Sequence, residues 1–271
     1  MDRYAVFGNP VSHSLSPRIH SLFAKQTGEA LEYTTLLAPR DDFAGAARRF
    51  FEEGGRGANV TLPFKIDALE FASKASDRAR LAGAANFLSM RSGSIEADNT
   101  DGAALVVDLT HNLKVGIRGS RILIIGAGGA ARGVIAPLLA LRPARVVITN
   151  RTPGRARELA SHFSTLGAIE AATLDAIPDG GFDIVLNATS MSVQGDVLRL
   201  PQPVMAASGL AYDMGYGEAA RVFLDLARAG GMRASDGLGM LVEQAAESFE
   251  LWRGVRPDTA PVLAQLRTRL A

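Results

Sequence analysis

Short apolar runs alternate with longer amphipathic stretches from the beginning of the chain. The run YAVFG at 4–8 leads into a helical pattern that ends near Gly28, and LEYTTLLA at 31–38 is followed by the amphipathic segment 41–54. The apolar run GANVTL at 57–62 comes next. Alternating strands and helices are typical of a parallel sheet, so this part of the chain predicts an α/β domain.

A second α/β unit begins near residue 121. The segment RILIIGAGGAARGVIAPLLA at 121–140 predicts an apolar strand, a glycine turn and a helix. The same alternation continues through strand-like runs at 144–150, 182–189 and 209–214 and helical stretches at about 153–163 and 218–229.

The last amphipathic segment is LVEQAAESFELW at 241–252. Helical spacing places Leu241, Ala245, Phe249 and Trp252 on one face, with Gln244 beside them. We expect this helix to pack back on the first domain. The predicted division is a first domain at 1–102, a second at 103–237 and C-terminal helices at 238–271.

Composition limits the classes of partner. The 271 residues are 47% hydrophobic and 21% charged, with a formal net charge of +1, which gives no electrostatic argument for nucleic acid or membrane binding. The absence of cysteine excludes disulfides and thiolate catalysis. No signal segment opens the chain, and no apolar run approaches the ~18 residues of a spanning helix. We therefore expect a cytoplasmic protein, a monomer or homodimer, with small-molecule partners.

The glycine turn carries a nucleotide-binding pattern. Residues 126–131, Gly-Ala-Gly-Gly-Ala-Ala, fit G-x-G-x-x-A between a strand and a helix. The first glycine permits a tight turn, and the second lets the backbone approach a pyrophosphate at the positive end of the helix. The alternative is a tight strand-to-helix turn that binds nothing. The sequence context favours a dinucleotide.

The next strand favours NADP over NAD. An NAD site normally carries Asp or Glu about 20 residues after the glycines, where the carboxylate binds the ribose 2′-hydroxyl. This chain has Asn150, Arg151 and Thr152 there, followed by Arg155. Guanidinium and hydroxyl groups bind a 2′-phosphate that a carboxylate would repel. The alternative is that both arginines are solvated residues at a helix start.

Two serines precede a helix in the first domain. In VSHSLSPRIH, Ser16 is expected as the N-cap and Pro17 as the first helical residue, and capping needs nothing from Ser14. Two hydroxyls beside a helix N-terminus would also suit a small carboxylate.

Four more polar residues follow predicted strands of the first domain. Taken singly, Thr61, Lys65, Asn86 and Asp101 are ordinary turn residues, and a lysine after a strand is usually solvated. Together they supply a hydroxyl, an ammonium, an amide and a carboxylate where open α/β sheets bind ligands. A polyhydroxylated acid would use such groups. The four histidines (His13, His20, His111 and His162) lack a metal-ligand spacing, and no G-x-S-x-G is present, so we expect no metal.

The motifs as a set resemble the shikimate dehydrogenase family, in the order of that family and over nearly the whole chain. This resemblance implies a two-domain α/β enzyme with an N-terminal substrate domain and a Rossmann-type NADP domain, the C-terminal helix returning to the substrate domain. It implies reversible reduction of 3-dehydroshikimate to shikimate by NADPH, in chorismate and aromatic amino acid biosynthesis. The motifs are VFGNPVSHSLSPRIH, ANVTLPFK, LAGAAN, DNTDG, IIGAGGAARGVIAPLL, ITNRT, NATS and DGLGMLVEQAAESFELWRG.

The resemblance also implies roles for individual residues. Ser14 and Ser16 would bind the substrate carboxylate, with Tyr216 nearby. Lys65 would be the catalytic acid/base, paired with Asp101, since a ketone reduced by hydride must also gain a proton. The ring hydroxyls would be held by Thr61, Asn86, Asp101 and Gln244. The cofactor would be held by Gly126, Ala127, Gly128, Gly129 and Ala130 at the pyrophosphate, Asn150, Arg151, Thr152 and Arg155 at the adenosine phosphate, Met214 and Gly237 at the nicotinamide, and Asp77.

The chain departs from the family pattern in three places. Phe87 stands where threonine is usual, Ser192 replaces a common glycine, and the segment after Tyr216 lacks the usual proline and threonine. A bulky Phe87 beside the substrate amide could reshape the pocket. The alternatives are therefore a paralogue that acts on quinate or an aminated shikimate analogue, a non-catalytic dinucleotide-binding sensor, and another NADP dehydrogenase of related plan.

Overall fold

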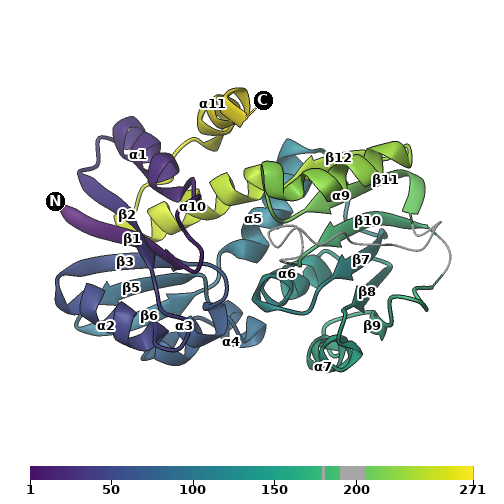
Figure 1. The fold of residues 1–271 in the computed structure, drawn as a ribbon, viewed down its shortest axis with the longest axis horizontal. Helices are drawn as coiled ribbons and strands as arrows, with labels where there is room; N and C mark the ends of the chain where they lie inside the picture. Colours follow the sequence, from purple (N-terminus) through teal and green to yellow (C-terminus); the bar gives the residue numbers. More distant parts are fainter. Residues whose placement is uncertain (179–180, 190–204, 271) are drawn as a thin grey trace. The chain divides into compact units, whose positions relative to one another are not determined.

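The computed structural model describes residues 1–178, 181–189 and 205–270 and divides into two compact units (Figure 1). Unit 1 comprises Met1–Leu105 and Leu241–Ala271, and unit 2 comprises Val106–Met240. The elements of unit 1 are β1 (Asp2–Gly8), α1 (Ser16–Thr27), β2 (Leu31–Leu37), α2 (Phe43–Glu52), β3 (Gly55–Val60), α3 (Lys65–Phe71), β4 (Lys74–Ala75), α4 (Asp77–Ala82), β5 (Phe87–Arg91), β6 (Ser94–Asp98) and α11 (Thr259–Leu270). Two helices contain the boundaries between the units, α5 (Asp101–Val107) and α10 (Leu238–Arg253).

The sheet of unit 1 has six strands in the order β2-β1-β3-β5-β6-β4. The first three are parallel, as the alternation of apolar runs and helices predicts. The β5–β6 hairpin then reverses direction. Its two-residue turn, Ser92-Gly93, has φ of 48° and 78°, and positive φ at both turn residues matches the twist of paired strands.

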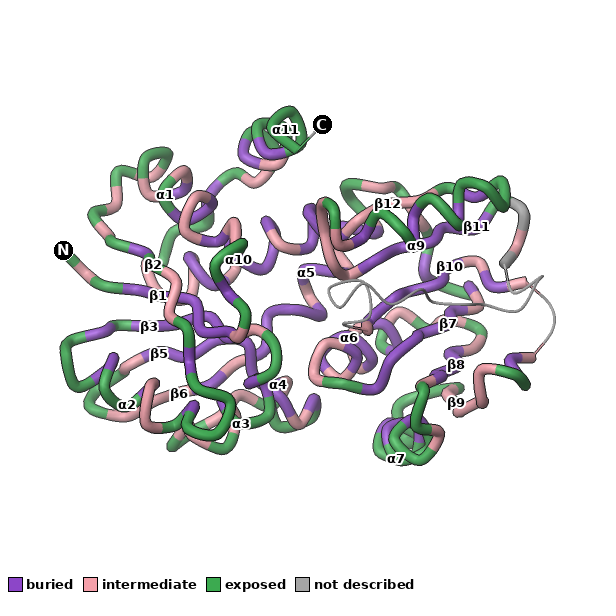
Figure 2. The backbone as a smooth tube through the Cα atoms, in the orientation of Figure 1, coloured by how far each residue is buried: buried purple, intermediate pink, exposed green. Residues whose placement is uncertain are grey.

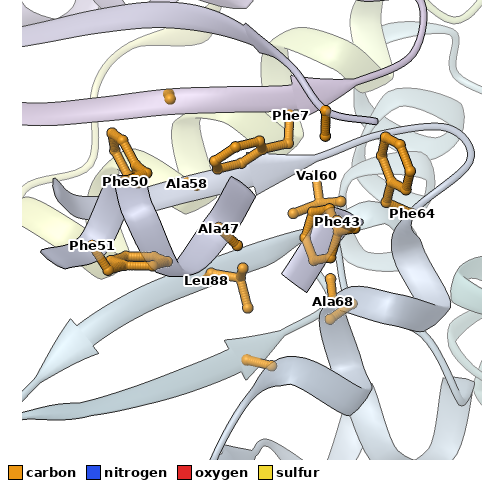
Figure 3. Close-up of a cluster of buried hydrophobic side chains, with 14 residues drawn as sticks. Phe7, Phe43, Ala47, Phe50, Phe51, Ala58, Val60, Phe64, Ala68 and Leu88 are labelled. Atoms are coloured by element: carbon orange, nitrogen blue, oxygen red, sulfur yellow. The ribbon is translucent and has the colours of Figure 1, made fainter. Parts of the chain in front are cut away.

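Alternate residues of β1 face two different cores. Phe7 packs with α2 and α3 in a cluster rich in phenylalanine, in which its ring meets those of Phe43 and Phe50 edge-on (Figure 3). Tyr4 and Val6 belong to a second cluster, with Tyr33 and with Trp252 of α10. Figure 1 shows α1 and α10 on one side of this sheet. Since strand side chains alternate between faces, one strand anchors helices on both sides.

The C-terminal helix α10 belongs to unit 1 from Leu241 onward, which confirms the predicted return of this helix to the N-terminal domain. Trp252 lies against Tyr4 at 4.6 Å and stacks on Phe87 at 5.1 Å between ring centroids, and its Nε1 donates to the Leu88 carbonyl. A Cβ at Gly57 would lie 2.2 Å from Trp252 Nε1, so only glycine lets the indole lie this close to β3.

Unit 2 has an all-parallel sheet in the order β12-β11-β10-β7-β8-β9. Its first strand, β7, lies at the centre, and the chain order reverses beside it as in a dinucleotide-binding fold. Figure 2 shows its central strands almost wholly buried, which accounts for their continuous apolar sequence. The elements are the π-helix η1 (Asp108–Asn112), β7 (Arg121–Ile125), α6 (Gly129–Ala140), β8 (Arg145–Thr149), α7 (Pro153–Phe163), β9 (Ile169–Ala172), β10 (Phe182–Asn187), β11 (Met205–Asp213), α9 (Glu218–Ala229) and β12 (Arg233–Asp236).

The expected start of α1 is wrong in one respect. Ser16 is the first helical residue and its hydroxyl does not cap the helix. Instead the Ser14 hydroxyl accepts the N–H of Ser16 at 3.2 Å, so Ser14 serves the helix start. Ser16 is buried, with 3% of its surface exposed. The sequence could not decide between the two serines, because both stand at the helix start.

His20 of α1 is fully buried among aromatic rings. It stacks on Tyr33 at 4.1 Å between ring centroids, with Trp252 at 5.5 Å and Phe249 at 6.1 Å. Neither ring nitrogen has a hydrogen-bond partner within the described chain. Burial lowers the pKa of His20 to about 3, so the folded protein keeps the imidazole neutral.

Acid should therefore destabilise the protein through His20. The unfolded chain binds a proton below pH ~6.5 and the folded chain does not, so stability falls as pH drops from ~6.5 toward 3. The free energy of unfolding at pH 5 should lie about 2 kcal/mol below that at pH 8 from this group alone. Urea titrations at both pH values should show this difference shrink in His20→Phe, which keeps the ring, and persist in His13→Gln, which changes an exposed histidine. An equal pH dependence in His20→Phe and the unmodified protein would contradict the assignment.

Candidate active site

A buried ion pair lies beyond the carboxyl ends of β3 and β6, two strands of unit 1. Lys65 opens α3 and Asp101 opens α5, and Lys65 Nζ lies 2.5 Å from Asp101 Oδ2. Lys65 is 9% exposed and Asp101 4%. The lysine backbone is held on both sides, since the ring of the preceding Phe64 stacks on Phe43 in the core and the Lys65 carbonyl accepts the N–H of Ala85. The lysine is therefore a fixed residue and not a solvated one.

Asn86 connects the ion pair to its surroundings. Its Nδ2 lies 2.9 Å from Asp101 Oδ1 and 2.9 Å from Thr100 Oγ1, and 3.4 Å from Gln244 Oε1. Its Oδ1 accepts the backbone N–H of Thr100 at 2.8 Å. Because a backbone N–H can only donate, this bond fixes which way the amide points and leaves the NH₂ facing Asp101. One carboxylate oxygen of Asp101 thus meets Lys65 and the other meets Asn86.

The segment that carries Asp101 is held by local bonds. Asn99 Oδ1 accepts the N–H of Asp101 at 3.1 Å, and Asn99 Nδ2 donates to the Ala84 carbonyl at 2.8 Å. This is the turn chemistry that Asn-Thr-Asp-Gly predicts. It sets the direction in which the carboxylate leaves the start of α5.

The ion pair can exchange a proton with a ligand. Asp101 is the one hydrogen-bond partner of Lys65 Nζ within the described residues, which leaves two of its N–H groups for a ligand oxygen. A buried ammonium–carboxylate pair is tolerated when the two groups are close together and further hydrogen bonds satisfy their remaining donors and acceptors. The geometry therefore supplies a positioned proton donor whose partner is itself fixed.

The structure brings four of the predicted substrate residues together: Lys65, Asn86, Asp101 and Gln244. No hydrogen bond in the described structure joins Ser14, Ser16 or Thr61 to this group. Thr61 directly follows β3 and donates its N–H to the Phe7 carbonyl.

Two further predicted residues, Tyr216 and Asp77, lie in other segments of the chain. Tyr216 lies in unit 2, between β11 and α9. Asp77 lies in unit 1 at the start of α4, with a fully exposed side chain that pairs with Arg80 at 2.6 Å. Every other residue predicted to bind cofactor lies in unit 2.

Asn59 was missed by the sequence analysis. It is 4% exposed in β3, where its Oδ1 accepts from Tyr33 and its Nδ2 donates to Ser248 and to the Asn86 carbonyl. It therefore joins the strand that leads to Lys65, the backbone of Asn86 and α10. The available signal was an amide inside the apolar run GANVTL, since a buried amide needs partners.

Phe87 packs in the core. Its side chain is 3% exposed and stacks on Trp252 of α10. Ser192, the second departure from the family pattern, lies outside the described residues.

The glycine turn of unit 2 lies at the switch point of its sheet. Gly126 follows β7 with φ of 115°, and a Cβ there would lie 2.9 Å from the Ala188 carbonyl oxygen after β10. Gly128 is the N-cap residue of α6, which has no side-chain cap, and no atom of the described residues beyond its chain neighbours lies within 4 Å of where its Cβ would be. The helix start is uncapped, and the chain runs from β7 to opposite sides of the sheet, which fits a pyrophosphate site.

The end of β8 carries no carboxylate. Asn150 donates its Nδ2 to the Thr152 carbonyl, and Arg151, Thr152 and Arg155 are exposed. No ion pair between described residues engages Arg151 or Arg155. Both guanidinium groups are therefore open to an anionic ligand.

Met214 and Gly237 lie side by side. A Cβ at Gly237 would lie 2.5 Å from the Met214 carbonyl oxygen, and Met214 donates its N–H to the Asn187 carbonyl at 2.9 Å. Glycine at 237 thus lets the two loops after β11 and β12 meet at the same edge as the glycine turn.

A separate pocket of about 260 Å³ lies at the other end of the unit 1 strands, next to Asp2 and Tyr4. Its arginines are Arg56, Arg91 and Arg253, and each pairs with a carboxylate. This balance gives the pocket no surplus charge to attract an ion.

Neither a metal cluster nor a membrane span occurs in the part of the chain that the structure describes. Those residues hold no group of three or more histidine, aspartate or glutamate side chains placed to bind a metal ion. Within the same residues, no helix combines the length and apolar character needed to cross a bilayer.

Comparison with known proteins gives matches along the chain. A family model for the shikimate dehydrogenase substrate binding domain matches residues 6–88, one for shikimate/quinate 5-dehydrogenase matches 108–195, and one for the shikimate 5′-dehydrogenase C-terminal domain matches 237–267.

Complete proteins match over their full length. The shikimate dehydrogenase (NADP(+)) of Chromohalobacter salexigens is 54% identical over 270 residues, which cover 99% of both chains. The solved structure of an Ael1 enzyme from Pseudomonas putida is 45% identical over 98% of both chains, with a TM-score of 0.90. Shikimate 5-dehydrogenase from Thermus thermophilus, solved with NADP(H) and shikimate, is 30% identical over 100% of both chains, with a TM-score of 0.84. The chain belongs to the shikimate dehydrogenase family.

Proposed function

We propose that this protein is an NADP-dependent shikimate dehydrogenase that interconverts 3-dehydroshikimate and shikimate, a step toward chorismate and the aromatic amino acids. The observation that carries the proposal is the buried Lys65–Asp101 pair bound to Asn86. It provides one proton donor and several hydrogen-bonding groups at the position where open α/β sheets bind ligands. Full-length similarity to NADP(+)-dependent relatives and the fold of unit 2 support the same reaction.

Unit 1 has the groups that a polyhydroxylated carboxylic acid requires. Asn86, Asp101 and Gln244 are close enough to bind neighbouring hydroxyls of one ring. The hydroxyls of Ser14, Ser16 and Thr61 add donors for the carboxylate and a further ring hydroxyl. Sites that bind a hydroxyl with buried polar groups discriminate strongly against analogues that lack it.

Unit 2 would hold the cofactor. Gly126 to Ala130 would contact the pyrophosphate, Asn150 to Arg155 the adenosine phosphate, and Met214 and Gly237 the nicotinamide. When bound, NADP supplies or accepts the hydride. Arg151 and Arg155 offer guanidinium groups where an NAD site has a carboxylate, so the 2′-phosphate would be favoured.

Lys65 moves the proton. In the reducing direction its ammonium donates one proton to the substrate oxygen that becomes a hydroxyl, and in the oxidising direction its amine takes that proton back. Asp101 holds the ammonium in place through Oδ2, while Asn86 stops the carboxylate from rotating toward the lysine with both oxygens. This is general acid–base catalysis by a positioned side chain.

The alternatives are not favoured. The shikimate dehydrogenase (NADP(+)) of Chromohalobacter salexigens matches over 99% of both chains. Lys65 and Asp101 are both present and paired, which a non-catalytic sensor would not need. Phe87 packs in the core and so gives no reason for a changed substrate.

Turnover tests this function directly. Nicotinamide absorbance should show rapid NADP reduction with shikimate, and little with quinate or with NAD. In Lys65→Ala, kcat should fall about 10²- to 10⁴-fold, the usual contribution of a general acid or base, while calorimetry still detects shikimate binding. Lys74→Ala, which alters an exposed lysine of the same unit, should leave kcat unchanged. A kcat in Lys65→Ala within about threefold of the unmodified protein would reject the role of Lys65, and no turnover with any pair would reject the function.

Cofactor choice gives a second test. Arg151→Ala should raise the KM for NADP about tenfold or more, because a charge-assisted hydrogen bond contributes about 1.5–3 kcal/mol. The KM for NAD should stay the same, since NAD has no 2′-phosphate. Arg157→Ala, an exposed arginine of α7 outside the predicted set, is the matched control. If Arg151→Ala weakened NADP and NAD equally, the 2′-phosphate assignment would fail.

A further inference from the structure

Arg78 is a half-buried cation close to the candidate active site that no step of the mechanism uses. It is the second residue of α4, with 37% of its side chain exposed. Its Nε lies 2.6 Å from Asp98 Oδ1 and its Nη2 lies 2.8 Å from Asp98 Oδ2. The third nitrogen, Nη1, bonds to Glu247 of α10. One guanidinium therefore spans two carboxylates from distant parts of the chain.

Asp98 connects Arg78 to the segment that ends in Asp101 through hydrogen bonds. Its Oδ1 also accepts the N–H of Asn99 at 2.7 Å and the Ser76 hydroxyl. Its backbone carbonyl accepts the N–H of Asn86 at 3.1 Å. Burial raises the pKa of Asp98, but the bonds from Arg78 and Ser76 outweigh it and the pKa lies below its ordinary value. The carboxylate stays ionised and holds the Asn99 N–H, while the backbone carbonyl of the same residue holds the Asn86 N–H.

Glu247 connects Arg78 to α10, the helix that carries the Gln244 side chain next to Asn86. It lies one helical turn after Gln244, whose Oε1 faces Asn86 Nδ2. Arg78 thus fixes the end of β6 and the middle of α10 relative to each other. Asn86 lies between these two elements, bonded to Asp101 just beyond β6 and to Gln244 of α10.

We propose that Arg78 is the positioning residue of the Lys65–Asp101 pair, acting through Asp98 and Glu247. Within the described residues, its hydrogen bonds and ion pairs go to Asp98 and Glu247 and not to the Lys65–Asp101 pair, Asn86 or Gln244. The inference rests on the proposed function, since it assigns Arg78 a share in the rate of that reaction. A misplacement of about 1 Å in a catalytic group can cost on the order of 10²-fold in rate, so the restraint has a measurable effect.

The role requires arginine and not merely a positive charge. The planar guanidinium group of Arg78 bonds to both carboxylate oxygens of Asp98 and also to Glu247. A lysine ammonium is a single point of charge and cannot reproduce this geometry. Arg78→Lys therefore keeps the charge and removes the geometry. It is also milder than Arg78→Met, which would leave two carboxylates facing each other without a cation.

Arg253 provides the matched control. It is the last residue of α10 and, like Arg78, joins two carboxylates, here Asp2 and Glu29, with Nε 2.7 Å from Glu29 Oε2. These partners lie at the start of β1 and just before β2, and no hydrogen bond of Arg253 within the described residues leads to Asn86 or Asp98. Arg253→Lys should therefore weaken the fold without disturbing the ion pair.

The experiment compares Arg78→Lys and Arg253→Lys in the full chain. Both should lower Tm by a few degrees. Only Arg78→Lys should lower kcat/KM for shikimate, by about 10- to 100-fold and mainly in kcat, with the KM for NADP within about twofold of the unmodified protein. Equal losses in the two variants, or no loss in Arg78→Lys, would overturn the inference.

A second readout separates this inference from the proposed function. In the absence of ligands, amide hydrogen exchange of the peptide covering 98–105 should be faster in Arg78→Lys and unchanged in Arg253→Lys. The reason is that the Asn99 N–H bonds to the Asp98 carboxylate and the Asp101 N–H bonds to the Asn99 side chain, so both amides depend on the position of Asp98. Unchanged exchange in Arg78→Lys would overturn the positioning role. If the unmodified protein failed to oxidise shikimate, the proposed function would fail, while this exchange result would still decide whether Arg78 holds the segment.

Discussion

The buried ion pair of Lys65 and Asp101 is the constraint on which the rest of unit 1 depends. Two charges removed from water are tolerated only when their remaining hydrogen-bonding capacity is satisfied in a fixed geometry. Asn86 meets the second carboxylate oxygen, and the local bonds of Asn99 hold the backbone that carries it. Lysine keeps two donors for a ligand because the described residues supply a single acceptor to it. The hydrogen bonds that make the buried pair stable are therefore the same ones that position the proposed proton donor.

The C-terminal helix completes this arrangement, although it is the last long segment before α11. Trp252 fixes one end of α10 over Gly57, and Gln244 faces Asn86 two turns earlier. Ser248 lies between them and bonds to Asn59 of β3. Core packing therefore places the Gln244 side chain beside Asn86, so that loss of the aromatic contacts would also displace a group that we propose to bind substrate.

The fold was largely predictable, because the strands of both units are short apolar runs separated by amphipathic helices and a glycine turn. The positions of Lys65 and Asp101 were also predictable, since each begins a helix directly after a strand or turn. The roles of Asn59 and Arg78 were not, because their partners lie as many as 189 and 169 residues away in the sequence. The Ser16 cap was mispredicted because two serines compete at one helix start. Local pattern specifies elements, whereas long-range hydrogen bonds specify the site.

A double-mutant cycle on kcat measures whether Lys65 and Asp101 act as one unit, which is the central claim. The variants are Lys65→Ala, Asp101→Ala and the combination, each assayed with saturating shikimate and NADP. If the two residues act as a unit, the loss of either one removes the contribution of both. The kcat of the double variant should then equal that of the slower single variant, within about threefold. If instead the two losses multiplied, the residues would contribute independently, and the account of a single positioned proton donor would be contradicted.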